Sequence, residues 1–82
     1  GDIQRFVGTY TGRGRGMPMT LTVAVENGAL AVNFRGAKRT LTHTGDGVFV
    51  TGNVRVIFGE TGGAVKSLRL DMGSGNNVLQ RQ

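Results

Sequence analysis

The sequence predicts an all-β fold, a small lipocalin-like barrel of about eight short antiparallel strands. Apolar and polar residues alternate with a period of two along much of the chain, and turn signals interrupt this alternation about every eight to twelve residues. The chain has 82 residues with 15 glycines, one proline and no cysteine. Eight strands can close into a barrel whose interior is filled by side chains or holds a small cavity. We therefore expect one domain over residues 1–82, a meander in which consecutive strands pair.

The best-defined element is a hairpin centred on Asn27-Gly28. Alternating runs over residues 20–26 and 30–35 flank this pair. An Asn-Gly pair between two such runs is typical of a type I′ turn, because both central residues need positive φ.

The remaining strands follow from the same alternation. In residues 64–72 we expect Lys66, Leu68, Leu70 and Met72 to share one face. The further strands are predicted over residues 38–44, 48–51, 54–58, 64–72 and 78–81. The turns that precede these strands are predicted, in the same order, at Gly36-Ala37, 45–47, Gly52-Asn53, 60–63 and 73–77.

The N-terminal segment has a different pattern. Its apolar residues have helical spacing, so Asp2–Phe6 is predicted to form one helical turn with Asp2 as the N-cap. A first strand, Gly8–Thr11, should follow and carry Tyr10.

The apolar residues on the inward faces are predicted to form a filled core, with a ligand cavity as the alternative. They are Leu21, Val23, Val25, Leu30, Val32, Phe34, Leu41, Phe49, Val56, Phe58, Leu68 and Leu70.

The charge is basic, with ten Lys and Arg residues against five Asp and Glu residues and a formal net charge of +5. Such a balance favours anionic partners. The cations are spread along the chain, however, and outward-facing charges also keep a small sheet in solution. Both interpretations stay open.

The run Gly12–Gly16 alternates glycine and arginine. We interpret it as a flexible hairpin loop with Arg13 and Arg15 in solvent. The alternative is a mobile basic loop that contacts an anionic ligand or a neighbouring domain. The chain has few aromatic residues to stack on bases, so nucleic acid is the least supported partner.

The sequence carries no recognisable catalytic motif. His43 is the only histidine and is expected to share a strand face with Leu41 and Arg39. No Asp or Glu stands at a spacing that would pair it with this histidine as a general base. Ser67 and Ser74 stand in no nucleophile motif. We predict no catalytic residue, no metal and no cofactor, and retain Arg39, His43 and Tyr10 as weak binding candidates. No apolar run is long enough to span a bilayer as a helix.

The order of these features resembles a known family. The similarity begins with Phe6-Val7-Gly8-Thr9-Tyr10. It continues through Glu26–Leu30 and Val56–Phe58 and ends with residues 63–68. This order of strands and turns is similar to that of the lipocalin-like β-barrel domain at the C-terminus of serine beta-lactamase-like hydrolases and penicillin-binding-protein relatives. The Arg-Gly run departs from that family's pattern.

The resemblance implies a non-catalytic accessory domain excised from a longer chain, whose partner is the upstream catalytic domain. It would pack near the parent active site or support assembly, in an extracytoplasmic or periplasmic location. The catalytic serine and lysine of that family belong to the upstream domain, so no catalytic residue is carried over. The alternatives are a free-standing barrel that binds a small hydrophobic or anionic ligand and, third, a basic nucleic-acid-binding module.

Overall fold

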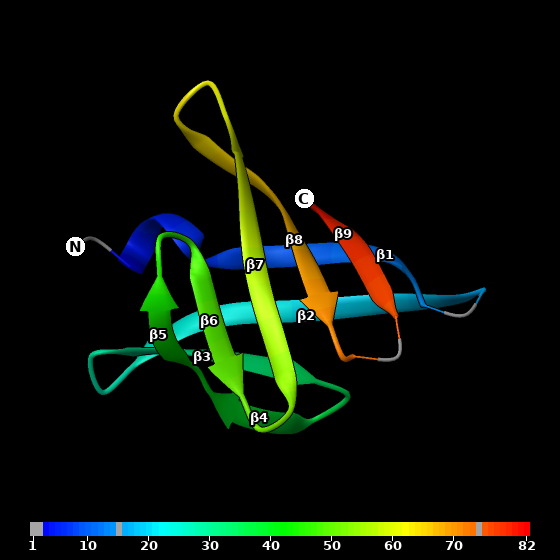
Figure 1. Ribbon diagram of the computed structural model, residues 1–82, viewed down its shortest axis with the longest axis horizontal. Helices are drawn as coiled ribbons and strands as arrows, with labels where there is room; N and C mark the ends of the chain where they lie inside the picture. The colour runs from blue at the N-terminus through cyan, green and yellow to red at the C-terminus, as the bar shows by residue number, and fades with distance from the viewer. Residues whose placement is uncertain (1–2, 15, 74) are drawn as a thin grey trace.

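The computed structural model describes residues 3–14, 16–73 and 75–82, and it shows one antiparallel sheet curved into a nearly closed barrel (Figure 1). The described strands follow the order β4-β3-β2-β1-β9-β8-β7-β6-β5. The predicted all-β meander is therefore confirmed. The elements are η1 (Ile3–Phe6), β1 (Gly8–Gly14), β2 (Met17–Glu26), β3 (Ala29–Phe34), β4 (Ala37–Thr40), β5 (Thr42–Gly45), β6 (Val48–Thr51), β7 (Val54–Thr61), β8 (Ala64–Asp71) and β9 (Asn76–Arg81).

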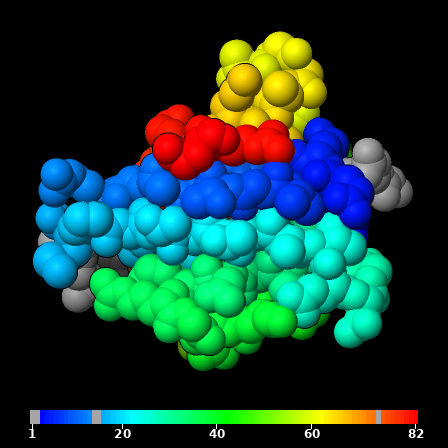
Figure 2. Space-filling model, turned by 180° about the vertical axis from the view of Figure 1, so that it is seen from behind, coloured from blue at the N-terminus to red at the C-terminus, as the bar shows by residue number. Residues whose placement is uncertain are grey.

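The first and last strands pair with each other in the middle of the sheet. Tyr10 of β1 faces Arg81 of β9, and Figure 2 shows β9 lying alongside β1. The two strands at the sheet's edges, β4 and β5, are consecutive in the chain and are separated by Leu41 alone. The predicted strand 38–44 is thus divided at Leu41, whose buried side chain points into the core and whose backbone N–H donates to the Leu30 carbonyl at 2.8 Å.

The meander places alternate turns at opposite ends of the barrel. The open end holds the end of β1 and the start of β2, the turns at Arg35-Gly36 and Gly52-Asn53, and Met72 just after β8, at the lower right of Figure 1. The plugged end holds the turns at 27–28, 46–47 and 62–63, together with η1.

The core is the line of inward-facing side chains, as predicted, except that Val25 and Phe34 are only partly buried. Phe6 of η1 joins it, because the single 3₁₀ turn carries this ring into the plugged end. The turn confirms the predicted helical turn, while its predicted N-cap, Asp2, lies outside the described residues. The buried core residues are Phe6, Tyr10, Leu21, Val23, Leu30, Val32, Leu41, Phe49, Val56, Phe58, Val65, Leu68, Leu70 and Leu79.

The type I′ turn at Asn27-Gly28 is confirmed, with φ of 54° and 79°. The next turn has the same conformation but lies one residue earlier than predicted. Arg35 and Gly36 have φ of 53° and 81°, and Phe34 pairs with Ala37 across them. The prediction of Gly36-Ala37 is wrong because Ala37 is the first residue of β4.

A bulge between β7 and β8 changes which residues of β8 face inward. Gly59 pairs with Ser67 and Glu60 pairs with Val65, so Lys66 is left over. The extra residue reverses the alternation, which buries Val65 and exposes Lys66. The predicted common face of Lys66 with Leu68 and Leu70 is therefore wrong for Lys66. The predicted loop at 60–63 is also shorter, since β7 runs through Thr61.

The Arg-Gly run is mostly strand. Gly12, Arg13 and Gly14 pair with β2, so the predicted loop over 12–16 is wrong for these residues, and Arg15 lies outside the described residues. A Cβ at position 12 would come within 2.6 Å of the Val78 carbonyl oxygen and 2.7 Å of Leu79 Cδ2. This glycine therefore allows β1 and β9 to approach closely.

Candidate ligand pocket at the open end of the barrel

The open end contains a cavity of about 250 Å³. Its walls come from β2, β3, β4, β6, β7 and β8 and from Met72 just after β8. All of the lining side chains are apolar except two, the Thr51 hydroxyl and the Arg39 guanidinium. The residues are Met19, Leu21, Val32, Phe34, Ala37, Arg39, Thr51, Val54, Val56, Leu70 and Met72.

The side chains that line this cavity include small and flexible ones. Ala37 is small, and the unbranched side chains of Met19 and Met72 adapt to irregular space. At the other end the Phe6 ring lies 4.5 Å from the Phe58 ring centroid and 5.4 Å from that of Phe49. This aromatic contact fills the interior there, whereas no aromatic cluster fills the open end among the described residues.

Arg39 supplies the positive charge of the pocket. Arg39 is two positions before the buried Leu41, so its side chain lies on the inward face of the sheet. It is exposed to solvent at the mouth of the pocket. Within residues 3–14, 16–73 and 75–82, its guanidinium has neither a hydrogen-bond acceptor nor an ion-pair partner. A second guanidinium is close, because Arg35 lies over the Phe34 ring at 5.0 Å from its centroid.

The carboxylate at this end is already engaged. Asp71 accepts hydrogen bonds from the Gly73 backbone N–H at 3.1 Å and from Arg55 at 3.0 Å. These two donors hold the pKa of Asp71 below its usual value, with the Gly73 bond as the larger cause. Asp71 therefore stays ionised and paired with Arg55.

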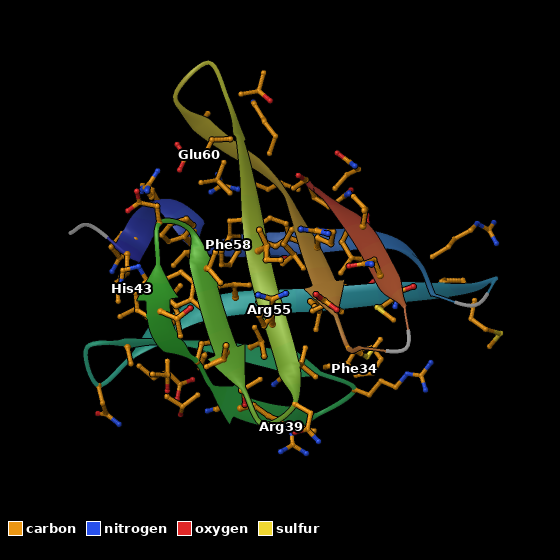
Figure 3. The ribbon with its side chains drawn as sticks, in the orientation of Figure 1. Phe34, Arg39, His43, Arg55, Phe58 and Glu60 are labelled. Carbon is orange, nitrogen blue, oxygen red and sulfur yellow. The ribbon has the colours of Figure 1, made fainter. Side chains whose placement is uncertain are left out.

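The structure separates two of the predicted candidates. Arg39 of β4 and His43 of β5 both face inward, but they belong to different strands and lie at opposite ends of the barrel (Figure 3). His43 borders a second, smaller hollow of about 180 Å³ beside Asp46 and η1. Its ring lies 4.9 Å from that of Phe49, and no group of three metal-ligating side chains occurs in the described part of the chain.

Tyr10 has a structural position. Its side chain is fully buried, and its hydroxyl donates to the Phe6 carbonyl at 2.8 Å, which ties η1 to the barrel. Burial raises the pKa of Tyr10 above its usual value, and the charge of Arg81 partly opposes that rise. Arg81 itself donates to the backbone carbonyls of Val65 at 3.0 Å and Val7 at 2.6 Å.

Arg13 does not reach the pocket lining. Its guanidinium donates to the Gly16 carbonyl at 3.1 Å and steadies the β1–β2 hairpin. The residues that sequence reasoning missed are those near the mouth, such as Met19, Ala37, Val54 and Met72. The alternation of side chains along β2 places Met19 on the inward face together with Leu21. This alternation alone does not show which inward-facing residues border empty space.

Comparison of the chain with protein-family models, curated proteins and solved structures found no match. The described helical structure is a single short turn, and no helix of sufficient length and hydrophobicity to cross a bilayer occurs in it.

Proposed function

We propose that the protein binds a small amphipathic anion, with the apolar part of the ligand in the open-end cavity and its carboxylate at Arg39. The observation that carries this proposal is an arginine without a described partner at the mouth of an otherwise apolar pocket. Ligand sites in proteins combine apolar walls with a few polar groups that fix orientation, and this cavity has that composition.

The size of the cavity limits the ligand. At about 30 Å³ for each water-sized group, a volume of 250 Å³ accommodates about eight such groups. This is slightly below the usual range for ligand pockets. A medium-length acyl chain fits better than a long fatty acid or a polycyclic compound, so octanoate is a suitable probe.

The head-group preference follows from the chemistry of arginine. A guanidinium forms paired hydrogen bonds with a carboxylate, and it keeps its charge at any physiological pH. The described carboxylate side chain of the open end, Asp71, is paired with Arg55. A ligand with the same chain and a neutral head should therefore bind more weakly.

The test is calorimetric titration with octanoate and with 1-octanol. Burial of most of an eight-carbon chain predicts a dissociation constant of about 10⁻⁴ to 10⁻³ M for octanoate. Arg39→Gln should weaken octanoate binding about fivefold to tenfold and leave 1-octanol binding unchanged. Lys66→Gln is the matched control, because it removes the same charge from an exposed bulge residue outside the pocket lining.

A second variant tests the cavity itself. Ala37→Trp places a large ring in the mouth of the pocket from a strand position that tolerates aromatic residues. It should abolish binding of both probes while the protein stays folded. The proposal is wrong if octanoate does not bind the wild-type protein, or if Arg39→Gln and Lys66→Gln bind it equally.

The accessory-domain function implied by the resemblance stays a prediction. Its test is the sequence of the gene that encodes this chain, where an upstream S-x-x-K motif followed by Y-x-N would support it. The isolated domain should then hydrolyse neither nitrocefin nor simple esters.

A further inference from the structure

The charged residues of the barrel are divided unequally between its two ends. The plugged end carries Glu26, Asp46 and Glu60 with the cations Arg5, Lys66 and Arg81, whereas Asp71 is the described carboxylate of the open end. Asp71 pairs with Arg55, and Lys38 pairs with Glu26. The open end is left with four arginines outside the described ion pairs, namely Arg13, Arg35, Arg39 and Arg69.

The large exposed apolar side chains lie at this same end. Among the described residues they are Met17, Val78 and Met72, with exposed fractions of 58%, 52% and 40%. Met17 begins β2, Met72 borders the cavity, and Val78 pairs with Arg69. Figure 3 shows the methionine sulfur atoms, drawn in yellow, on the same side of the molecule as Phe34. Exposed apolar side chains and arginines outside the described ion pairs thus share one end of the barrel, although Arg13 and Arg69 donate hydrogen bonds to Gly16 and Asn76.

We infer that the open end docks on the surface of an anionic lipid bilayer. In this arrangement the arginines contact lipid phosphates, and Met17 and Met72 enter the head-group region. Two interactions hold peripheral proteins on membranes. One is the attraction of cationic side chains to anionic lipids, and the other is the insertion of apolar side chains at the membrane boundary. The inference does not depend on a ligand in the cavity, although docking would turn the pocket mouth towards the lipid.

The aromatic residues favour a bilayer over a nucleic acid. Binding of single-stranded nucleic acid relies on exposed rings that stack on bases. Phe6, Tyr10, Phe49 and Phe58 are buried in the core, and the fifth ring, Phe34, is partly buried beneath Arg35. Methionine and valine side chains offer no stacking surface, whereas they enter a lipid head-group layer readily.

The first test is cosedimentation with vesicles of phosphatidylcholine alone and of phosphatidylcholine mixed with phosphatidylglycerol. The wild-type protein should bind the mixed vesicles and not the neutral ones. Arg35→Asn should reduce binding about fivefold, and Arg13→Gln with Arg35→Asn about 25-fold, since each cation near the surface contributes about a factor of five. Lys66→Gln, at the plugged end, should change binding less than twofold.

The second test reports orientation. The chain has no tryptophan, so a single introduced tryptophan is the sole indole fluorophore. Met17→Trp places it at the open end, and Thr61→Trp places it in the exposed hairpin at the plugged end. Mixed vesicles should shift the emission of the first variant to shorter wavelength and leave that of the second unchanged.

Three results would overturn the inference. One is equal loss of vesicle binding in Arg35→Asn and Lys66→Gln, which would indicate attraction by net charge alone. Another is a blue shift of Trp at position 61 instead of position 17. The third is tighter binding to mixed-sequence RNA or DNA than to the mixed vesicles. Octanoate titration is a separate measurement, so failure of docking and failure of ligand binding are distinguishable.

Discussion

The two ends of this barrel are closed in different ways. At the plugged end η1 inserts Phe6 between two other rings, and Tyr10 holds that turn by a buried hydrogen bond. At the open end the strands continue to their turns with methionine, alanine and valine on the inward face, and a cavity remains. The same strand alternation therefore produces a packed interior at one end and an unfilled cavity at the other. Stability and candidate function are divided along the barrel axis.

The largest effect should come from removal of the plug. Phe6→Ala should lower the free energy of unfolding by about 3–5 kcal/mol, because it deletes a buried ring and leaves a cavity. Phe34→Ala at the open end should cost about 1–2 kcal/mol, since that ring is only partly buried and already borders open space. Urea denaturation measures both.

Phe6→Ala can lower stability to the point where the protein does not fold, so Phe6→Leu provides a milder variant. It should still cost more than Phe34→Leu. Equal costs at the two positions would show that the plug contributes no special stability.

The next effect concerns the pairing of the first strand with the last. Gly12→Ala should destabilise the protein by about 1–3 kcal/mol, because the added Cβ meets the backbone of β9. Gly75→Ala is the control, since a Cβ at that position has no atom within 4 Å. A thermal melt that gives the two variants the same midpoint would contradict the close approach of β1 and β9.

Tyr10→Phe tests the hydrogen bond behind the plug. It should cost about 1 kcal/mol at neutral pH, because the Phe6 carbonyl loses its donor. The raised pKa of Tyr10 means that the folded state favours the protonated phenol. That part of the stability is present below the unfolded pKa of about 10 and is lost as the pH rises through the folded value.

The pH dependence can be followed directly. Tyr10 is the single tyrosine, so the absorbance of its phenolate reports one group. Ionisation should begin at a higher pH in the folded protein than in urea, and Tyr10→Phe should lose less stability than the wild type above about pH 10. Identical titrations in the folded and unfolded protein would exclude the raised pKa.

The smallest effect compares one turn from each end. Asn27-Gly28 and Arg35-Gly36 have the same backbone conformation, but asparagine tolerates a positive φ better than arginine does. Arg35→Asn should raise the free energy of unfolding by about 0.5 kcal/mol, and Asn27→Arg should lower it by about the same amount. Opposite signs in denaturant titrations would mean that the arginine contact with Phe34 outweighs the backbone preference.

The fold follows from sequence where the signal is local. The Asn27-Gly28 turn and the alternation beside it require neighbouring residues only, so that hairpin could be predicted in detail. Three other features depend on how the whole barrel curves. They are the division of one predicted strand at Leu41, the bulge at Lys66 and the pairing of Gly12 with β2. Glycine at position 12 indicates flexibility in the sequence, yet in the structure it marks close strand packing.

The site was predictable only in part. Strand parity correctly placed Arg39 and His43 on the inward face, but they belong to different strands and lie at opposite ends of the barrel. Whether an inward side chain is covered depends on what lies across the barrel. Met19 and Met72 therefore became visible as pocket residues only in the closed structure.

The pairing of the first strand with the last has a consequence for the order of folding. The side chain of Thr11 is hydrogen-bonded to that of Gln82, 71 positions later, whereas every other described strand pairing joins two strands that are consecutive in the chain. The entropy lost on closing a loop increases with its length, so this contact is the most expensive to form. We expect the hairpins on either side of Leu41 to assemble first and the β1–β9 contact to form after the rate-limiting step. Stopped-flow kinetics of Gly12→Ala should then show faster unfolding with an unchanged refolding rate.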